Sequence, residues 1–167
     1  MKKLLLFFLV LPLLFASCAD GTRAADILGY ESAGGELSLS FRADGQDFSA
    51  TLSLGEERRL TFASPASVAG VSYSLSGDAI TASFGDGGEV RGEFPLPRAI
   101  FDCFSLSERL AGGELEFLSE EGKVFVFESD DVRYEIHASG EIPTRIVRRA
   151  DGEILTVDIG GMAPDGA

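Results

Sequence analysis

Most of this chain alternates apolar and polar residues with a period of two, in short runs that end at Gly and Asp. In the first run, polar residues separate Leu37, Leu39 and Phe41, and Asp44-Gly45 follows. Side chains of a strand point alternately to its two faces, and an Asp-Gly pair favours the tight turn of a β-hairpin. The pattern therefore excludes a mainly helical fold and predicts antiparallel strands with one apolar face.

Eleven such runs are predicted as strands. They lie at residues 37–42, 48–54, 60–64, 71–75, 80–84, 90–94, 114–119, 123–128, 132–138, 144–149 and 153–159. The run 124–127 is apolar at every position, so we expect a central strand that is covered on both faces. Residues 98–110 change period, because their apolar side chains fall mostly on one helical stripe, and Gly112-Gly113 follow. This segment is predicted to be the one convincing helix of the fold.

These elements limit the architecture, and a length of 167 residues suits a single domain. About 13 helical residues span only about 20 Å, so one helix does not cover a flat sheet of eleven strands. The sheet must curl over its own apolar face. We expect a mainly β fold, a strongly curved antiparallel sheet of about 10–11 strands that forms an unclosed half-barrel, with the helix inserted in its concave side. A sandwich with the helix as a lid at one end is the alternative.

The N-terminus has the composition of an export signal. Lys2 and Lys3 precede an apolar run at residues 4–16, which is shorter than the about 20 residues of a membrane span and ends in small residues. Residues 15–18, Phe-Ala-Ser-Cys, resemble the bacterial lipobox, with Phe where Leu is usual. This resemblance implies cleavage before Cys18 and acylation of its thiol. The alternative is ordinary cleavage, with Cys18 free or paired with Cys103.

We therefore divide the chain into a lipoprotein signal peptide at 1–17, a flexible tether at 18–26, a β-rich domain at 27–160 and a disordered tail at 161–167. The export signal predicts that the mature protein lies on the extracytoplasmic side of a bacterial membrane. Its acyl chains are expected to anchor it there, because they gain about 0.8 kcal/mol per buried CH₂. Which membrane holds it, and its oligomeric state, are left open. Cys103 has apolar neighbours and is expected to be an inert buried thiol.

The charge of the chain disfavours a nucleic-acid partner. There are 14 Lys and Arg against 27 Asp and Glu, a formal charge of -13, and an acidic protein is repelled by a polyanion. Removal of the signal peptide takes away Lys2 and Lys3 and makes the balance more acidic still. An anionic membrane repels such a domain within a Debye length of about 8 Å, so attachment is expected to depend on Cys18.

Motifs that carry catalytic chemistry are not found. His137 is the single histidine and is expected on a strand face, and no His or Cys set has metal-ligand spacing. The loop 85–89 supplies only two carboxylates for calcium. We expect no cofactor, no metal and no catalytic residue, although 27 acids leave a carboxylate pair open. The basic cluster Arg145, Arg148 and Arg149 either pairs with acids or binds an anionic head group.

The order of elements resembles the LolA/LolB-like group of lipoprotein carriers over residues 26–160. The residues that carry the resemblance are the export signal, the early hairpin, the run Leu60-Thr61-Phe62-Ala63-Ser64-Pro65 with Gly70-Val71 after it, and the strand series that leads to a helix. It implies an unclosed antiparallel barrel with helices in its mouth and a hollow that holds acyl chains. This chain departs from the group in two ways. The helix before the first strand is reduced to about residues 24–30, and one helix remains to cover the concavity.

Two functions follow as hypotheses. The first is a membrane-anchored lipoprotein that binds or carries a hydrophobic or amphiphilic ligand, or a lipidated protein, with no covalent step. Its ligand would contact an inward aromatic set, which is plain core on the second interpretation: Phe41, Phe48, Phe62, Tyr73, Phe84, Phe94, Phe101, Phe104, Phe117 and Tyr134. The second hypothesis is a ligand-free lipoprotein that binds another envelope protein or has a structural role. If Phe101 and Phe104 pack the concave face solid, a ligand has no place there.

Overall fold

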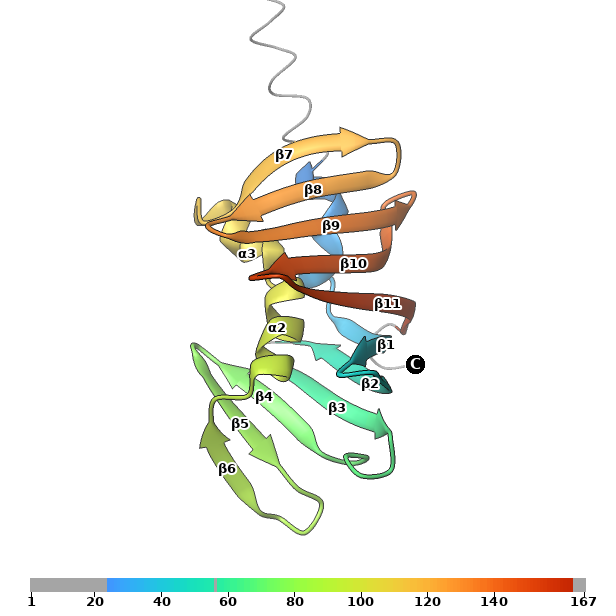
Figure 1. Cartoon of the computed structure of the whole chain (residues 1–167). Coiled ribbons are helices and arrows are strands. Elements are labelled where there is room, and N and C mark those ends of the chain that lie inside the picture. Colours follow the sequence, from blue (N-terminus) through green and yellow to red (C-terminus); the bar gives the residue numbers. More distant parts are fainter. Residues whose placement is uncertain (1–23, 56, 164–167) are drawn as a thin grey trace, which may run out of the picture.

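One antiparallel sheet forms most of the structure, a computed structural model that describes residues 24–55 and 57–163, with side chains up to residue 161 (Figure 1). Within this part of the chain the sheet has eleven strands. They are β1 (Gly35–Ala43), β2 (Gln46–Leu54), β3 (Arg58–Ser64), β4 (Ser72–Ser76), β5 (Ala79–Ser83), β6 (Glu89–Gly92), β7 (Glu116–Glu121), β8 (Val124–Ser129), β9 (Val132–Ser139), β10 (Ile142–Ala150) and β11 (Glu153–Ala163).

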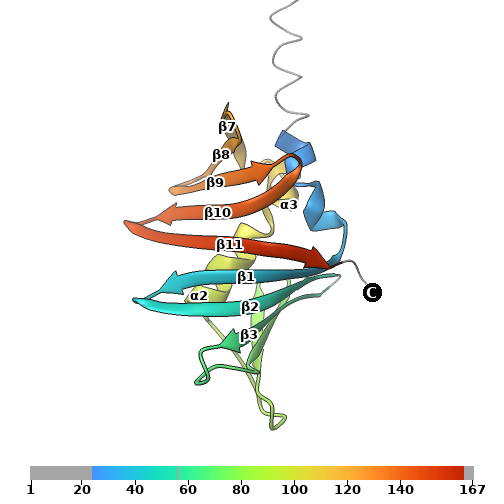
Figure 2. The same cartoon turned by 90° about the vertical axis from the view of Figure 1, so that its right-hand side faces the viewer.

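The strand order leaves the barrel open. It runs β6-β5-β4-β3-β2-β1-β11-β10-β9-β8-β7, so the first and last strands pair in the middle and β6 and β7 are the edges. In the central pair, Phe41 lies opposite Val157 and Leu37 opposite Met162. The sheet curves, and the short helices lie on its concave side (Figure 2). These findings confirm the predicted fold class, an unclosed antiparallel half-barrel, and exclude the sandwich.

The strands form where the alternation predicts them, because consecutive runs are joined by tight turns. Asp44 and Gly45 between β1 and β2 both have positive φ, 50° and 76°, as a two-residue hairpin turn requires. Asp151 and Gly152 repeat this geometry between β10 and β11. Leu37, Leu39 and Phe41 of β1 are buried and the residues between them are exposed.

The predicted single helix at 98–110 is wrong, because two helices replace it. They are α2 (Pro95–Cys103) and α3 (Leu106–Ala111). Phe104 and Ser105 between them leave the helical conformation, and the Ser105 hydroxyl donates a hydrogen bond to the carbonyl oxygen of Phe101 at 2.8 Å. The helix also begins earlier than expected, since Pro95 occupies its first turn, where an N–H is not needed.

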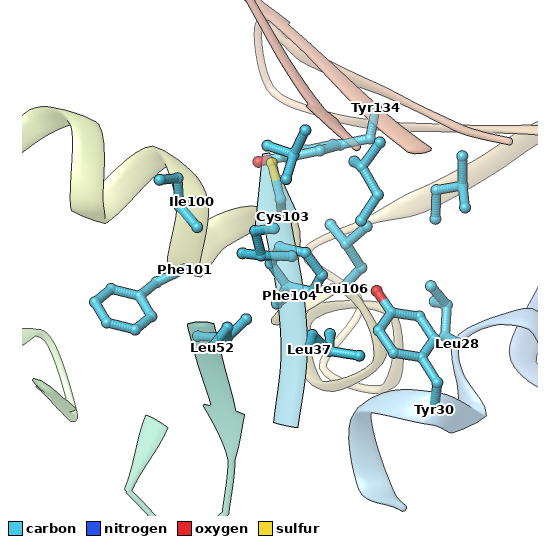
Figure 3. Close-up of a cluster of buried hydrophobic side chains, with 14 of the residues drawn as sticks. Leu28, Tyr30, Leu37, Leu52, Ile100, Phe101, Cys103, Phe104, Leu106 and Tyr134 are labelled. Carbon is cyan, nitrogen blue, oxygen red and sulfur yellow. The ribbon is translucent and has the colours of Figure 1, made fainter. Parts of the chain in front are cut away.

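The concave side of the sheet is the core. Ile100, Phe101, Cys103, Phe104 and Leu106 of the helical region have no exposed surface. They meet the apolar face of the strands and the segment before β1, where a helical turn at 24–27 and the 3-10 helix η1 (Gly29–Ser32) supply Leu28 and Tyr30 (Figure 3). In the part of the chain that the structure describes, no helix is long and apolar enough to cross a membrane.

Two boundaries and the place of one strand differ from the prediction. Ala24 is fully buried in a helical turn, so residues 24–26 of the predicted tether belong to the folded domain. Strand β11 runs to Ala163, so residues 161–163 of the predicted tail pair with β1. In the run 124–127, Phe125, Val126 and Phe127 are buried, on both faces as expected, but β8 lies beside the edge strand β7 and is not central. The signal peptide 1–17, Cys18, the remaining tether and residues 164–167 lie outside the described residues.

Candidate functional site

The ten aromatic residues predicted to face a ligand divide into three groups by exposure. Phe41, Phe62, Phe101, Phe104 and Tyr134 are buried, Phe48, Tyr73, Phe94 and Phe117 are half-buried, and Phe84 is 42% exposed. The structure brings five of them into one row of ring contacts. Phe48 stacks on Phe41 at 5.4 Å between ring centroids, Phe62 contacts both, and Tyr73 joins Phe62 to Phe94. This row crosses β1 to β4 and ends at the start of α2.

The concave face beneath the two helices is packed solid. Phe101 and Phe104 have no exposed surface, and Figure 3 shows them among side chains from α2, β1, β2 and the segment before β1. Cys103 is buried beside them, and desolvation raises the pKa of its thiol to about 12. The thiol is therefore protonated at neutral pH and unreactive. An acyl chain does not fit beneath the helices as it would in an empty hollow.

A buried carboxylate ties the N-terminal segment to this packing. Glu31 of η1 is only 7% exposed and accepts hydrogen bonds from the backbone N–H groups of Leu106 and Ser107, each at 3.0 Å, and from the Ser107 hydroxyl at 2.6 Å. It thereby caps the first turn of α3. Burial is the main cause that raises the pKa of Glu31, and the hydrogen bonds from Ser107 and Leu106 oppose that shift.

An open groove lies beside α2, where the helix faces the ends of β1 and β11. This α2 groove has a volume of about 600 Å³. Leu96 and Ala99 of α2 and Leu155 of β11 form its apolar floor. The charged groups of its rim are Arg42, Arg98, Arg148, Asp44, Asp102 and Glu153. The groove therefore offers apolar contacts next to charged ones, and it opens to solvent.

A second opening, of about 480 Å³, adjoins the α2 groove and shares Arg98, Asp102 and Arg148 with it. We call it the arginine pocket, because four arginines line it: Arg58, Arg98, Arg109 and Arg148. Arg58 forms a salt bridge with Glu108 at 3.2 Å, and Arg98 forms one with Asp102 at 3.2 Å and one with Asp78 at 3.7 Å. Two of the four arginines thus have acidic partners.

Arg109 and Arg148 have no acidic partner among the described residues. Arg109 of α3 donates hydrogen bonds to the Tyr134 hydroxyl and the Ser129 hydroxyl, each at 2.7 Å, and its guanidinium lies 5.5 Å from the Tyr134 ring centroid. The Nε of Arg148 is buried and has no hydrogen-bond partner.

The predicted basic cluster is therefore divided between the two faces of the sheet. Arg145 pairs with Asp158, and Arg149 pairs with Glu135 at 3.2 Å, so the acid-pairing interpretation describes these two. Arg148 lies on the concave face, opposite Tyr134 of β9 and Leu155 of β11 in the strand register. Strand alternation alone places residue 148 on the other face from 149, whereas the open pocket next to it is visible only in the fold.

The single histidine and the acidic loop 85–89, the other candidates for a catalytic or metal site, do not form one in the described part of the structure. His137 is half-buried on β9, on the face opposite the buried Ile136. In the loop 85–89, an Asp86 carboxylate oxygen accepts a hydrogen bond from the Gly88 N–H, and Glu89 accepts one from Ser83. No three His, Cys, Asp or Glu side chains within residues 24–55 and 57–163 are grouped as a metal ion needs.

Comparison with known proteins supports the fold. No family model matches the sequence, and no curated protein does. An uncharacterized conserved protein from Thermus thermophilus is 9% identical, with a TM-score of 0.52 over 87% of this chain and 88% of that one. A LolA superfamily protein from Nitrosomonas europaea is 13% identical, with a TM-score of 0.50 over 89% of this chain and 94% of that one. At these identities the likeness shows a shared fold, which is LolA-like.

Proposed function

We propose that this protein is a bacterial cell-envelope lipoprotein, attached to the membrane through acylated Cys18, that binds a hydrophobic or amphiphilic ligand in the α2 groove. The ligand is a lipid or the acyl chain of a lipidated protein, and no covalent step takes place. The α2 groove carries the proposal, because a volume of about 600 Å³ with an apolar floor lies within the range of about 300–1,000 Å³ typical of ligand pockets.

The filled concavity defines how the ligand binds. Because Phe101 and Phe104 occupy the space beneath the helices, the chain lies in the α2 groove, between α2 and the ends of β1 and β11, where it keeps part of its contact with water. Burial of about eight methylenes at about 0.8 kcal/mol each gives on the order of 6 kcal/mol. That corresponds to a dissociation constant of roughly 10–100 µM, which suits a ligand that is picked up and released.

Binding is tested with a Cys18→Ala protein, which stays unacylated. Native mass spectrometry reads any lipid that co-purifies, and titration with a fluorescent fatty acid reads the affinity. Ala99→Phe places a ring on the floor of the α2 groove, and we expect it to weaken binding at least tenfold. Ala111→Phe makes the same change at the exposed end of α3, outside the groove, and should bind like the parent. No co-purified lipid together with no fatty-acid binding would refute the proposal.

Membrane attachment is tested separately in cells. An alkynyl fatty acid fed to the bacteria should label the wild-type protein and leave Cys18→Ala unlabelled, because acylation takes place on that thiol. The variant should also leave the membrane fraction, since a protein with a formal charge of -13 is repelled by an anionic membrane. Label that persists in Cys18→Ala would disprove the assigned cleavage site.

The second candidate function is that this protein carries no ligand and binds another envelope protein. One observation favours it. Phe84 and Val90 are 42% and 53% exposed near the edge strand β6, where apolar area is available to a protein surface. If this candidate is correct, Val90→Glu removes a cross-link to an envelope protein in cells and Ala99→Phe does not. The opposite result favours the α2 groove.

A further inference from the structure

The arginines of this acidic protein are unequally paired with acids. Seven arginines of the described residues form salt bridges: Arg42, Arg58, Arg59, Arg98, Arg133, Arg145 and Arg149. The arginines of this part of the chain without an acidic partner are Arg91, Arg109 and Arg148. Arg91 is exposed on the edge strand β6. The other two are half-buried and face the same opening, the arginine pocket.

Arg148 is the less satisfied of the two. Its Nε is shielded from solvent and has no hydrogen-bond partner, whereas Arg109 uses both terminal nitrogens on Tyr134 and Ser129. A buried donor without an acceptor costs free energy, so native proteins rarely keep one without a reason. The guanidinium carries five donors in a planar fork, which matches two oxygens of a carboxylate or phosphate.

The acids around this guanidinium are already engaged or are exposed. Asp102 of α2, which lines the pocket with Arg148, binds Arg98 at 3.2 Å. Glu108 of α3 binds Arg58. Glu114 and Glu153, at the rims of the pocket and the groove, are both exposed. The charges of Arg109 and Arg148 are thus not neutralised by an acidic partner within the described part of the protein.

The position of Arg148 connects this positive charge with the apolar floor of the α2 groove. Arg148 lines both openings. Its register partner on β11 is Leu155, which belongs to that floor, and its partner on β9 is Tyr134, which contacts Arg109. An anion at the guanidinium therefore has cationic groups on one side and an apolar surface on the other. This is the arrangement that an amphiphile with a charged head requires.

We propose that the ligand of the α2 groove is an anionic amphiphile, whose carboxylate or phosphate binds Arg148 while its apolar chain lies along Leu96, Ala99 and Leu155. Arg109 adds a second positive charge near the head group. The assignment rests on the proposed function, since it names the ligand class of the same groove. It also explains why one arginine of the predicted basic cluster faces the concave side without a partner.

The test compares ligands with the same chain and different heads, on the Cys18→Ala protein by isothermal titration calorimetry. Laurate and dodecyl phosphate should bind at least tenfold more tightly than dodecanol, and dodecylamine should bind most weakly. Inorganic phosphate, which has no chain, should bind at least tenfold more weakly than dodecyl phosphate. Equal affinity for laurate and dodecanol, or tighter binding of dodecylamine, would overturn the assignment and leave the proposed function standing.

The variants place the effect at one residue. Arg148→Met keeps the length of the stem and removes the charge, and it should weaken laurate at least tenfold while dodecanol changes less than twofold. Arg149→Met is the matched control on the other face of β10 and should leave both affinities within twofold. Inorganic phosphate that binds as tightly as dodecyl phosphate would refute an amphiphile at this site.

Two further outcomes separate the proposals. If none of the long-chain compounds binds, the proposed function itself fails. If Arg148→Met does not fold by circular dichroism, the wild-type ranking of laurate, dodecanol and dodecylamine still decides the question, and Arg148→Gln provides a second variant.

Discussion

The apolar face of the strands is covered at one end of the half-barrel and partly exposed at the other. At the end formed by β8 and β9, α3 and the segment before β1 cover the face, and the side chains that hold them there are polar: Glu31 caps α3, and Arg109 binds Tyr134 and Ser129. At the end formed by β3 to β6, Tyr73 and Phe94 stay half-buried and Phe84 stays exposed.

The difference shows that strand alternation determines which side chains face inward and does not determine whether something covers them. The covered end has a helix and a buried carboxylate, and its aromatic Tyr134 is 1% exposed. The open end has only α2 beside it (Figure 1). The α2 groove lies between these two environments, and for this reason our proposal assigns ligand binding to the groove and not to the space beneath the helices.

The largest expected effect concerns the core at the helix break. Phe104→Ala should lower the free energy of unfolding by about 3–5 kcal/mol, because it opens a cavity at a fully buried site. Phe84→Ala at the open end should cost less than about 1 kcal/mol, since that ring is 42% exposed. Urea unfolding followed by circular dichroism measures both. Similar losses for the two variants would mean that the open end is covered in solution.

The next effect tests the polar attachment of α3. Arg109→Met removes the donors to Tyr134 and Ser129, of which Ser129 is only 7% exposed. The unpaired hydroxyls should cost about 1–3 kcal/mol in the free energy of unfolding. Arg133→Met is the control, because the Arg133–Glu135 salt bridge is partly exposed and should contribute less than about 1 kcal/mol. If the control loses as much, the attachment of α3 does not depend on these bonds.

The smallest effect concerns Glu31 and its dependence on pH. Burial raises the pKa of Glu31 in the folded protein, so the folded state favours the protonated form more than the unfolded state does. The contribution of Glu31 to stability is therefore fully present below its unfolded pKa and is lost as the pH rises through its folded pKa. Glu31→Gln removes this dependence, and its cost should be smallest at pH 7 and grow as the pH falls, to about 1 kcal/mol through weaker capping of α3.

The measurement for Glu31 is a series of urea unfolding curves from pH 7 to pH 4, which extends below the ordinary pKa of 4.5 for this carboxyl group. The stability of the wild type relative to Glu31→Gln should increase as the pH falls over this interval. A relative stability that decreases toward pH 4 would show that the hydrogen bonds from Leu106 and Ser107 outweigh burial and lower the pKa of this carboxyl group. Unfolding curves of Asp26→Asn, an exposed acid near the same turn, control for general charge effects.

Much of the fold could be predicted from the residues, because strand signals are local. Alternation and Asp-Gly turns act over two to nine residues, and all eleven runs are strands. The helix is the exception, because the pattern predicts one helix where the structure has two. Its apolar stripe continues through Phe104, so periodicity alone does not reveal a break that depends on the Ser105 hydroxyl bonding to Phe101 and on Glu31 capping α3. Glu31 lies 75 residues before Leu106 in the sequence.

The candidate site was predicted in part. The aromatic set was identified correctly as inward-facing for Phe41, Phe62 and Tyr134, which are buried, but their role as ligand contacts stays untested. Arg148 was identified as one of three basic residues with two open interpretations. Its separation from Arg145 and Arg149 follows from alternation, whereas its lack of a partner depends on where Asp102 and Glu108 bind in three dimensions.

The sequence by itself determined the strands, their turns and the inward face of each strand, since these depend on neighbouring residues and on a period of two. It also predicted the export signal and the acylated Cys18, which stay predictions. Only the tertiary structure decided that Phe101 and Phe104 fill the concavity, that a groove opens beside α2 and that Arg148 has no acidic partner. The groove and the Arg58–Glu108 salt bridge depend on residues far apart in the chain, and no local pattern encodes the distance between them.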